Sequence, residues 1–149
     1  DAKTGRHLVD YANSRRSIYQ PVIRNKVYSL FQTFEFPSPS LVSGRRATTT
    51  VPPQLLLMMN SELVARCSLA MSGRMLQDSS LTQAERISLS YESAYGRIPG
   101  KVEVRRASEF LERFEQAVSP EHPRADQEAR AWRAFCQALM VSNEFVYLD

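Results

Sequence analysis

The chain has 149 residues and a mass of 17.0 kDa, which is the size of one ordinary domain. Apolar residues make up 43% and charged residues 23% of it, a composition typical of a globular protein. Two cysteines and two histidines are too few for a disulfide-rich scaffold or a four-cysteine zinc site. No apolar run approaches the roughly 18 residues of a membrane-spanning helix, so we expect no membrane span.

The formal charge of +3 is unevenly distributed along the chain. Residues 1–80 hold 10 basic and 5 acidic residues, a net of +5, whereas residues 81–149 hold 9 basic and 11 acidic, a net of −2. Of the basic residues, 16 are arginine and 3 are lysine. These arginines occur singly and in pairs, without a basic tail or interleaved aromatic residues, so the pattern does not favour nucleic-acid binding.

The first fifty residues are expected to be largely irregular. Residues 6–14 suit a short helix, and residues 17–24 alternate β-branched and aromatic residues around Pro21, which predicts an extended segment. Asn25 is a candidate N-cap for a second short helix that the prolines from Pro37 onward end. Its predicted apolar face consists of Val27, Leu30, Phe31 and Phe34. Residues 43–51 are expected to form a loop.

The remaining residues predict a series of helices. Pro52 and Pro53 fit a first helical turn, and a long helical stretch over 54–77 is expected to bend near 60–61. Residues 55–59 are apolar all round, which predicts the central buried helix. We therefore expect a mainly α fold, a compact bundle of about four to five helices with an irregular, partly extended N-terminal segment. The domain prediction is one domain over 1–149, in which a basic segment 1–50 packs on a helical part 51–149.

Local signals in the C-terminal half mark where its helices start and stop. Thr82 and Glu85 form a capping-box pattern, and Gly96 is a natural residue for the helix end. A further helix follows the turn at 98–100, and the last helix is expected over 124–142, before an extended apolar tail at 145–148. The predicted core side chains are Tyr91, Phe110, Phe114, Trp132, Phe135 and Leu139.

Few residues of the chain predict chemistry. Cys67 and Cys136 fall on apolar helical faces and are expected to be buried thiols, with a disulfide between them as the alternative if the chain is exported. The carboxylates of the C-terminal half interleave with arginines, a pattern typical of solvated helix faces with i,i+4 pairs. Glu144 lies among apolar residues, so it either caps a helix end or binds an arginine.

The N-terminal arginines are the candidate site. Their guanidinium groups and the neighbouring threonine hydroxyls could together bind sulfate, phosphate or carboxylate, or else hold the segment in place as a structural or interface element. The set consists of Arg15, Arg16, Arg24, Arg45, Arg46, Thr49 and Thr50. No catalytic residue and no metal ligand is assigned.

Several motifs, taken together and in order, resemble the C-terminal part of the planctomycete-type domain-of-unknown-function family 1553. They are Arg-Arg-Ser-Ile-Tyr at 15–19, Phe-Glu-Phe-Pro-Ser-Pro at 34–39, Gly-Arg-Arg-Ala-Thr-Thr-Thr at 44–50, Leu-Met-Met-Asn at 57–60, Tyr-Gly-Arg-Ile-Pro at 95–99 and Ser-Asn-Glu-Phe-Val-Tyr at 142–147. The resemblance covers nearly the whole chain. The segment 91–147 is also loosely similar to helical repeat modules of secreted proteins.

The resemblance implies context rather than a reaction. Such domains end large exported proteins, often after a cytochrome c domain, so the Met-less start of this chain is expected to mark a fragment. It implies an exported or periplasmic location, other domains of the parent protein as partners, and haem c, if any, in a separate domain. The expected function is a non-catalytic interaction or assembly module. The alternatives are the substrate-binding part of an exported enzyme acting on an anionic, sulfated polysaccharide, or an electron-transfer module paired with the cytochrome c domain.

Overall fold

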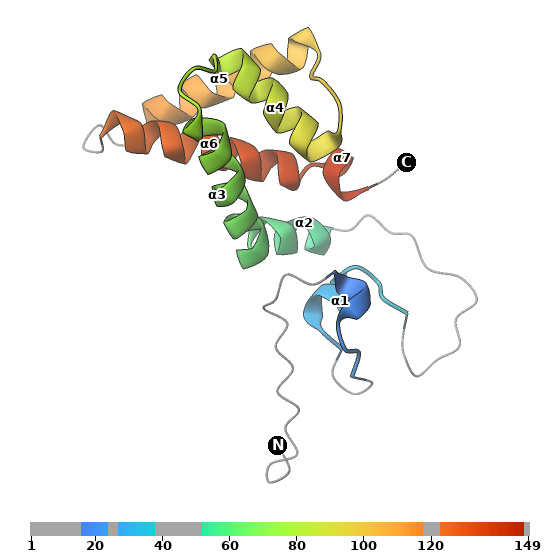
Figure 1. The fold of residues 1–149 in the computed structure, drawn as a ribbon. Coiled ribbons are helices and arrows are strands. Elements are labelled where there is room, and N and C mark those ends of the chain that lie inside the picture. Colours follow the sequence, from blue (N-terminus) through green and yellow to red (C-terminus); the bar gives the residue numbers. More distant parts are fainter. Residues whose placement is uncertain (1–15, 24–26, 38–51, 118–122, 148–149) are drawn as a thin grey trace. The chain divides into compact units, whose positions relative to one another are not determined.

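The computed structural model describes residues 16–23, 27–37, 52–117 and 123–147 (Figure 1). The chain divides into two compact units, residues 1–54 and residues 55–149, and each unit is described by itself. The described residues are mainly helical and contain no strand. No helix among these residues is both long and apolar enough to cross a membrane.

The described part of the first unit contains a 3-10 turn at Ser17–Tyr19 and a short helix α1 at Ser29–Thr33. The prediction of an extended segment was wrong for residues 17–19, because the Tyr19 N–H donates to the Arg16 carbonyl at 2.9 Å and closes a tight turn. The chain becomes extended at Gln20, before Pro21. Tyr28 precedes α1 as its N-cap, while the predicted cap Asn25 lies outside the described residues.

Helix α1 ends before the prolines, through a hydrogen-bond pattern at its last turn. The Phe36 N–H donates to the Phe31 carbonyl at 2.8 Å, and the Glu35 N–H donates to the Gln32 carbonyl at 3.2 Å. Glu35 itself has a φ of 52°, in the left-handed region. The two bonds and the left-handed residue define a Schellman motif, in which the flanking apolar side chains pack together. Here the rings of Phe31 and Phe36 stack with centroids 5.2 Å apart.

The long helix expected over 54–77 is two helices, α2 at Pro52–Met59 and α3 at Glu62–Gln77. They separate at Asn60 and Ser61, where a bend was predicted, and the Asn60 side chain donates to the Leu56 carbonyl at 2.9 Å. The prediction that residues 55–59 form the central buried helix was wrong. Leu55, Leu56 and Met59 are each about half exposed, because the core forms around other helices.

The second unit continues with α4 at Gln83–Tyr95, α5 at Lys101–Ala117, α6 at Arg124–Met140 and the single-turn α7 at Asn143–Val146. The capping box at the start of α4 is confirmed, since Glu85 N–H donates to Thr82 Oγ1 and Thr82 N–H donates to Glu85 Oε2. Gly96 ends α4 with a φ of 69°, as predicted. The prediction of an extended tail over 145–148 was wrong for residues 145 and 146, which belong to α7. Ser142 Oγ caps this turn by accepting from the Phe145 N–H.

The core of the second unit lies between α3, α4, α5 and α6. Helix α3 crosses α6 in Figure 1, and this pair makes the most extensive contact of the unit. Trp132, Phe135 and Leu139 are buried as predicted, and Tyr91 and Phe114 pack against them half-buried. Its fully enclosed side chains include Ile87, Leu111, Ala131 and Cys136.

Two predicted core residues lie at the surface. Phe110 is 36% exposed, although its ring still contacts Phe135 with centroids 6.2 Å apart. Cys67 is exposed, whereas Cys136 is buried, and both are free thiols. Cys67 lies one residue before Ser68, which is buried. Neighbouring residues of a helix point in different directions, so the Cys67 side chain lies at the surface while that of Ser68 faces the core.

Candidate functional site

Of the seven N-terminal residues predicted to bind an anion or form an interface, the structure describes Arg16 alone. Its side chain is exposed, immediately before the 3-10 turn at Ser17–Tyr19. The other six, Arg15, Arg24, Arg45, Arg46, Thr49 and Thr50, lie outside the described residues. Whether that set forms one site therefore stays a prediction.

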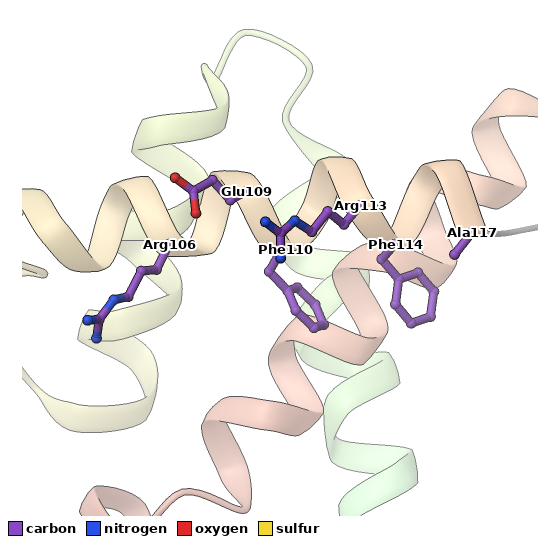
Figure 2. A pocket seen from close by; sticks show the side chains of 6 residues that line it. All are labelled: Arg106, Glu109, Phe110, Arg113, Phe114 and Ala117. Atoms are coloured by element: carbon purple, nitrogen blue, oxygen red, sulfur yellow. The ribbon is translucent and has the colours of Figure 1, made fainter.

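The described residues bring together a different group of arginines, beside α5. A hollow of about 370 Å³ is lined by residues of that helix alone: Arg106, Glu109, Phe110, Arg113, Phe114 and Ala117. In Figure 2 the two phenylalanine rings and the Arg106 side chain extend to the same side of α5, while Glu109 extends to the other side. The helix period explains this arrangement, because residues 106, 110, 113, 114 and 117 recur at intervals of three and four.

A second hollow, of about 460 Å³, extends the first toward α6. It is lined by Phe114 together with Arg130, Arg133, Ala134 and Gln137 of α6. Phe114 lines both hollows, so they adjoin at its side chain. We call the two adjoining hollows together the α5–α6 groove, made of Arg106, Glu109, Phe110, Arg113, Phe114 and Ala117 of α5 and Arg130, Arg133, Ala134 and Gln137 of α6.

Both walls of the groove are held by buried packing. Ala107 and Leu111 of α5 and Ala131 of α6 are almost fully enclosed, and Phe110 contacts both Phe114 and Phe135 at centroid distances of 5.9 and 6.2 Å. These contacts fix the groove residues on rigid helices rather than on loops.

The far end of the groove is held by a polar contact. The Gln137 side chain donates to the Met59 carbonyl at 3.0 Å, which connects α6 to the last residue of α2. This bond uses one of the two N–H groups of the Gln137 amide.

Four arginines and one acidic residue, Glu109, line the groove, which gives it an excess of positive charge. None of its four arginines forms an ion pair with a carboxylate of the described residues. Glu109 forms its ion pair with Arg105, at 3.9 Å, and Arg105 does not line the groove. The exposed Arg105–Glu109 pair contributes little to stability at that distance. Because the groove arginines form no ion pair themselves, they are available to an acidic ligand.

A second constellation joins α4, α5 and α7. Arg97 donates to both carboxylate oxygens of Glu103, at 2.9 and 2.7 Å, and to both of Glu144, at 2.6 and 2.8 Å. Its guanidinium carbon lies 5.5 Å from the Tyr91 ring centroid and 5.6 Å from that of Tyr95. Of the two roles left open for Glu144, the structure shows arginine binding, since Ser142 is the cap.

The Arg97 contacts set the ionisation of their partners. Hydrogen bonds from Arg97 and from the Gly100 N–H lower the pKa of Glu103 to about 2, and those from Arg97 lower the pKa of Glu144. Both carboxylates are therefore charged at neutral pH and occupied by one guanidinium. We interpret this cluster as a structural clamp between three helices, because every charged member already has a partner.

The buried thiol belongs to the core. Burial raises the pKa of Cys136 to about 12, an effect that the positive charge of Arg74 opposes. The thiol is therefore protonated at neutral pH and packs as a small apolar group. Among the residues that the structure describes, no three histidine, cysteine or acidic side chains lie close enough together to hold a metal ion.

The sequence interpretation missed the α5–α6 groove. It assigned Arg106, Arg113 and Arg130 to solvated helix faces with i,i+4 partners, but Arg105–Glu109 is the one such ion pair in the described part of the chain. A usable signal was present within α5, where arginine and phenylalanine alternate at helical spacing. The contribution of α6 depends on which helix packs beside α5, and local sequence does not specify that.

The second unit is a small α-helical unit with a basic, partly aromatic groove along two of its helices. A family model described as a protein of unknown function (DUF1553), named PSD1, matches residues 3–111. The chain belongs to that family, as the motifs indicated. No curated protein and no solved structure gives a significant match to the chain.

Proposed function

We propose that this chain is a non-catalytic interaction module that assembles with another protein domain through the α5–α6 groove. The observation that carries the proposal is the combination of four arginines, none of which forms an ion pair among the described residues, with two accessible phenylalanine rings. Arginine and aromatic side chains are enriched in protein–protein interfaces, where a few of them provide most of the binding energy.

The packing of the groove also suits binding. Leu111 and Ala131 are fully enclosed behind it, so a partner meets side chains whose backbone positions are already fixed. A preorganised surface loses less conformational entropy when a partner binds than a loop does. Phe114 is half-buried and Phe110 is 36% exposed, which leaves apolar area for a partner to cover.

Site-specific photo-crosslinking tests this proposal. A photoreactive amino acid replaces Ala117 or Ala134, both in the groove, or Ser93, which is exposed on α4 and serves as the control. The variants are expressed in the native cells, and the crosslinked peptides are identified by mass spectrometry. We expect positions 117 and 134 to join to the same segment of one protein or domain, and position 93 to give no such adduct.

Two results would contradict the proposal. One is the absence of a defined protein adduct at both groove positions, or the same adduct from Ser93. The other is catalysis: if the purified chain alone hydrolysed or oxidised members of a polysaccharide panel, the non-catalytic role would be wrong.

The wider context follows from the resemblance and is also a proposal. We propose that the parent protein is long, exported and multidomain, with this chain near its C-terminal end and any haem c in another domain. The resemblance of the motifs to this family supports the proposal. The complete reading frame tests it, because an export signal and further upstream domains are expected, and their absence would contradict it.

The alternative function is substrate binding in an exported enzyme that acts on an anionic polysaccharide. The observation that favours it is the arginine-rich N-terminal sequence, because guanidinium groups bind sulfate as well as carboxylate. If the N-terminal set binds that substrate, replacing Arg45 and Arg46 by alanine abolishes turnover by the full-length protein without unfolding it. A loss of folding would instead indicate a structural role for the two arginines.

A further inference from the structure

We infer that the partner segment in the α5–α6 groove is an acidic amphipathic helix of another protein domain, which places carboxylates against the arginines and an apolar stripe against the phenylalanine rings. This inference rests on the proposed docking role and specifies the chemistry of the partner. Three features of the groove support it: the spacing of its charges, the mainly apolar lining of its α5 part and the scarcity of neutral hydrogen-bonding groups.

The arginines are spaced as a helical partner requires. Arg106 and Arg113 are seven residues apart on α5, which corresponds to about 10 Å along the helix at a rise of roughly 1.5 Å per residue. Acidic residues seven apart on a second helix have the same separation. Arg130 and Arg133, one turn apart on α6, line the adjoining hollow of the groove. The guanidinium group pairs with a carboxylate through two parallel hydrogen bonds, which favours acidic side chains on the partner.

The α5 part of the groove has a mainly apolar lining, whereas the α6 part is more polar. Phe110 and Phe114 are one turn apart on α5, and their ring centroids lie 5.9 Å from each other. Ala117 and Ala134 continue the apolar lining without bulk. Leucine or similar side chains repeating every three or four residues on a partner helix would pack along such a strip, as in other helix-in-groove complexes. An extended polyanion offers charge but no apolar side chains to cover the rings.

Neutral hydrogen-bonding side chains are scarce in the groove, which argues against a carbohydrate. Apart from charged groups, its lining residues have aromatic and methyl groups and the amide of Gln137, which already donates to the Met59 carbonyl. A sugar presents many hydroxyl groups that need partners when water is removed. The groove therefore favours the carboxylates and apolar side chains of an amphipathic helix over a sulfated chain.

Fluorescence anisotropy with the full 149-residue chain tests the inference. The probes are a labelled 20-residue helical peptide with glutamates seven apart beside a leucine stripe, a scrambled peptide of the same composition, and the same peptide with its leucines replaced by serine. A sulfated oligosaccharide serves as competitor. We expect the amphipathic peptide to bind at least ten times more tightly than both other peptides, and the affinity to fall with salt.

Charge reversal locates the binding. Arg130→Glu, in the groove, is compared with Arg66→Glu, an identical change at an exposed position of α3 outside it. We expect Arg130→Glu to weaken the amphipathic peptide at least tenfold and Arg66→Glu to change its affinity less than twofold. Circular dichroism at 222 nm confirms that each variant is folded.

The outcomes separate this inference from the docking role. Equal binding of all three peptides, or equal effects of the two reversals, would overturn the acidic-helix inference. Tighter binding of the sulfated oligosaccharide than of the peptide would overturn it in favour of the polysaccharide. In either case a defined protein adduct at positions 117 and 134 would leave the docking role intact. The absence of that adduct would contradict both the docking role and the acidic-helix inference.

Discussion

Replacing Tyr95 by phenylalanine removes one hydroxyl group from the junction of α4, α6 and α7. The Tyr95 hydroxyl lies 3.2 Å from the Leu139 carbonyl oxygen and 2.9 Å from Ser142 Oγ. Ser142 Oγ also donates to the Leu139 carbonyl at 2.8 Å and accepts from the Phe145 N–H at 3.3 Å. Both former partners therefore keep a hydrogen bond in the variant, and no buried polar group loses every partner.

The expected cost of Tyr95→Phe follows from this geometry. A neutral hydrogen bond contributes a net of about 0.5–1.5 kcal/mol, and the larger penalty for an orphaned group does not apply here. We expect the free energy of unfolding to fall by about 1 kcal/mol, which corresponds to a loss of about 2–4 °C in Tm for a domain of this size. The aromatic ring stays, so its contact with Arg97 is kept.

Tyr91→Phe is the matched control. Tyr91 precedes Tyr95 by one turn of α4 and also contacts Arg97, but its hydroxyl has no hydrogen-bond partner among the residues that the structure describes. Urea unfolding, followed by circular dichroism and by the fluorescence of the buried Trp132, gives both free energies. We expect Tyr91→Phe to change stability by less than about 0.5 kcal/mol. Equal effects of the two substitutions would refute the assigned role of the Tyr95 hydroxyl.

Three further predictions test other features of the second unit. Because the pKa of Glu103 is depressed in the folded state, its stabilising contribution is present above the unfolded pKa of 4.5 and is lost as the pH falls toward about 2. The free energy of unfolding of Glu103→Gln should therefore depend less on pH between 4.5 and about 2 than that of the unchanged protein. Thr82→Ala removes the cap of α4 and should cost about 1 kcal/mol in urea unfolding. A thiol reagent should modify the exposed Cys67 in the folded protein, and the enclosed Cys136 only after unfolding.

Each of these predictions has a clear contrary result. An unchanged pH dependence in Glu103→Gln would mean that the Arg97 contacts do not stabilise the fold. A neutral Thr82→Ala would show that the capping box is not formed in solution. Modification of both thiols at the same rate under native conditions would contradict the enclosed position of Cys136.

Signals carried by a few neighbouring residues were predictable from the sequence. The capping box at Thr82, the left-handed residue Gly96 and the break at Asn60 each depend on hydrogen bonds within one turn, so the residue types alone indicate them. The extent of α6 was also predictable to within two residues at its end, because its apolar period is long and regular.

Features that depend on which helices meet were not predictable. The apolar segment of α2 was expected in the core, but Leu56 is 59% exposed, because apolar composition indicates only that a helix can be buried. The pairing of Arg97 with Glu144 joins residues 47 positions apart. Residues 145 and 146 were expected to be extended because a single turn has little helical signal of its own, and α7 is held by the Ser142 cap and the Arg97 clamp.

The groove was missed for the same reason. The arginines of α5 and α6 look like ordinary solvated residues when each helix is considered alone. Their hollows adjoin because α5 packs beside α6, as the contact of Phe110 with Phe135 shows, and Phe114 lines both hollows. The N-terminal arginines, which the sequence favoured, lie mostly outside the described residues and remain a prediction.

Amide hydrogen exchange tests most directly the central claim that the α5–α6 groove is a docking surface. Exchange is measured on the chain alone and in complex with the partner identified by crosslinking. Docking in the groove predicts slower exchange confined to residues 106–117 and 130–137, with α4 unchanged over residues 83–95. Slower exchange over α4, with α5 and α6 unaffected, would contradict the claim.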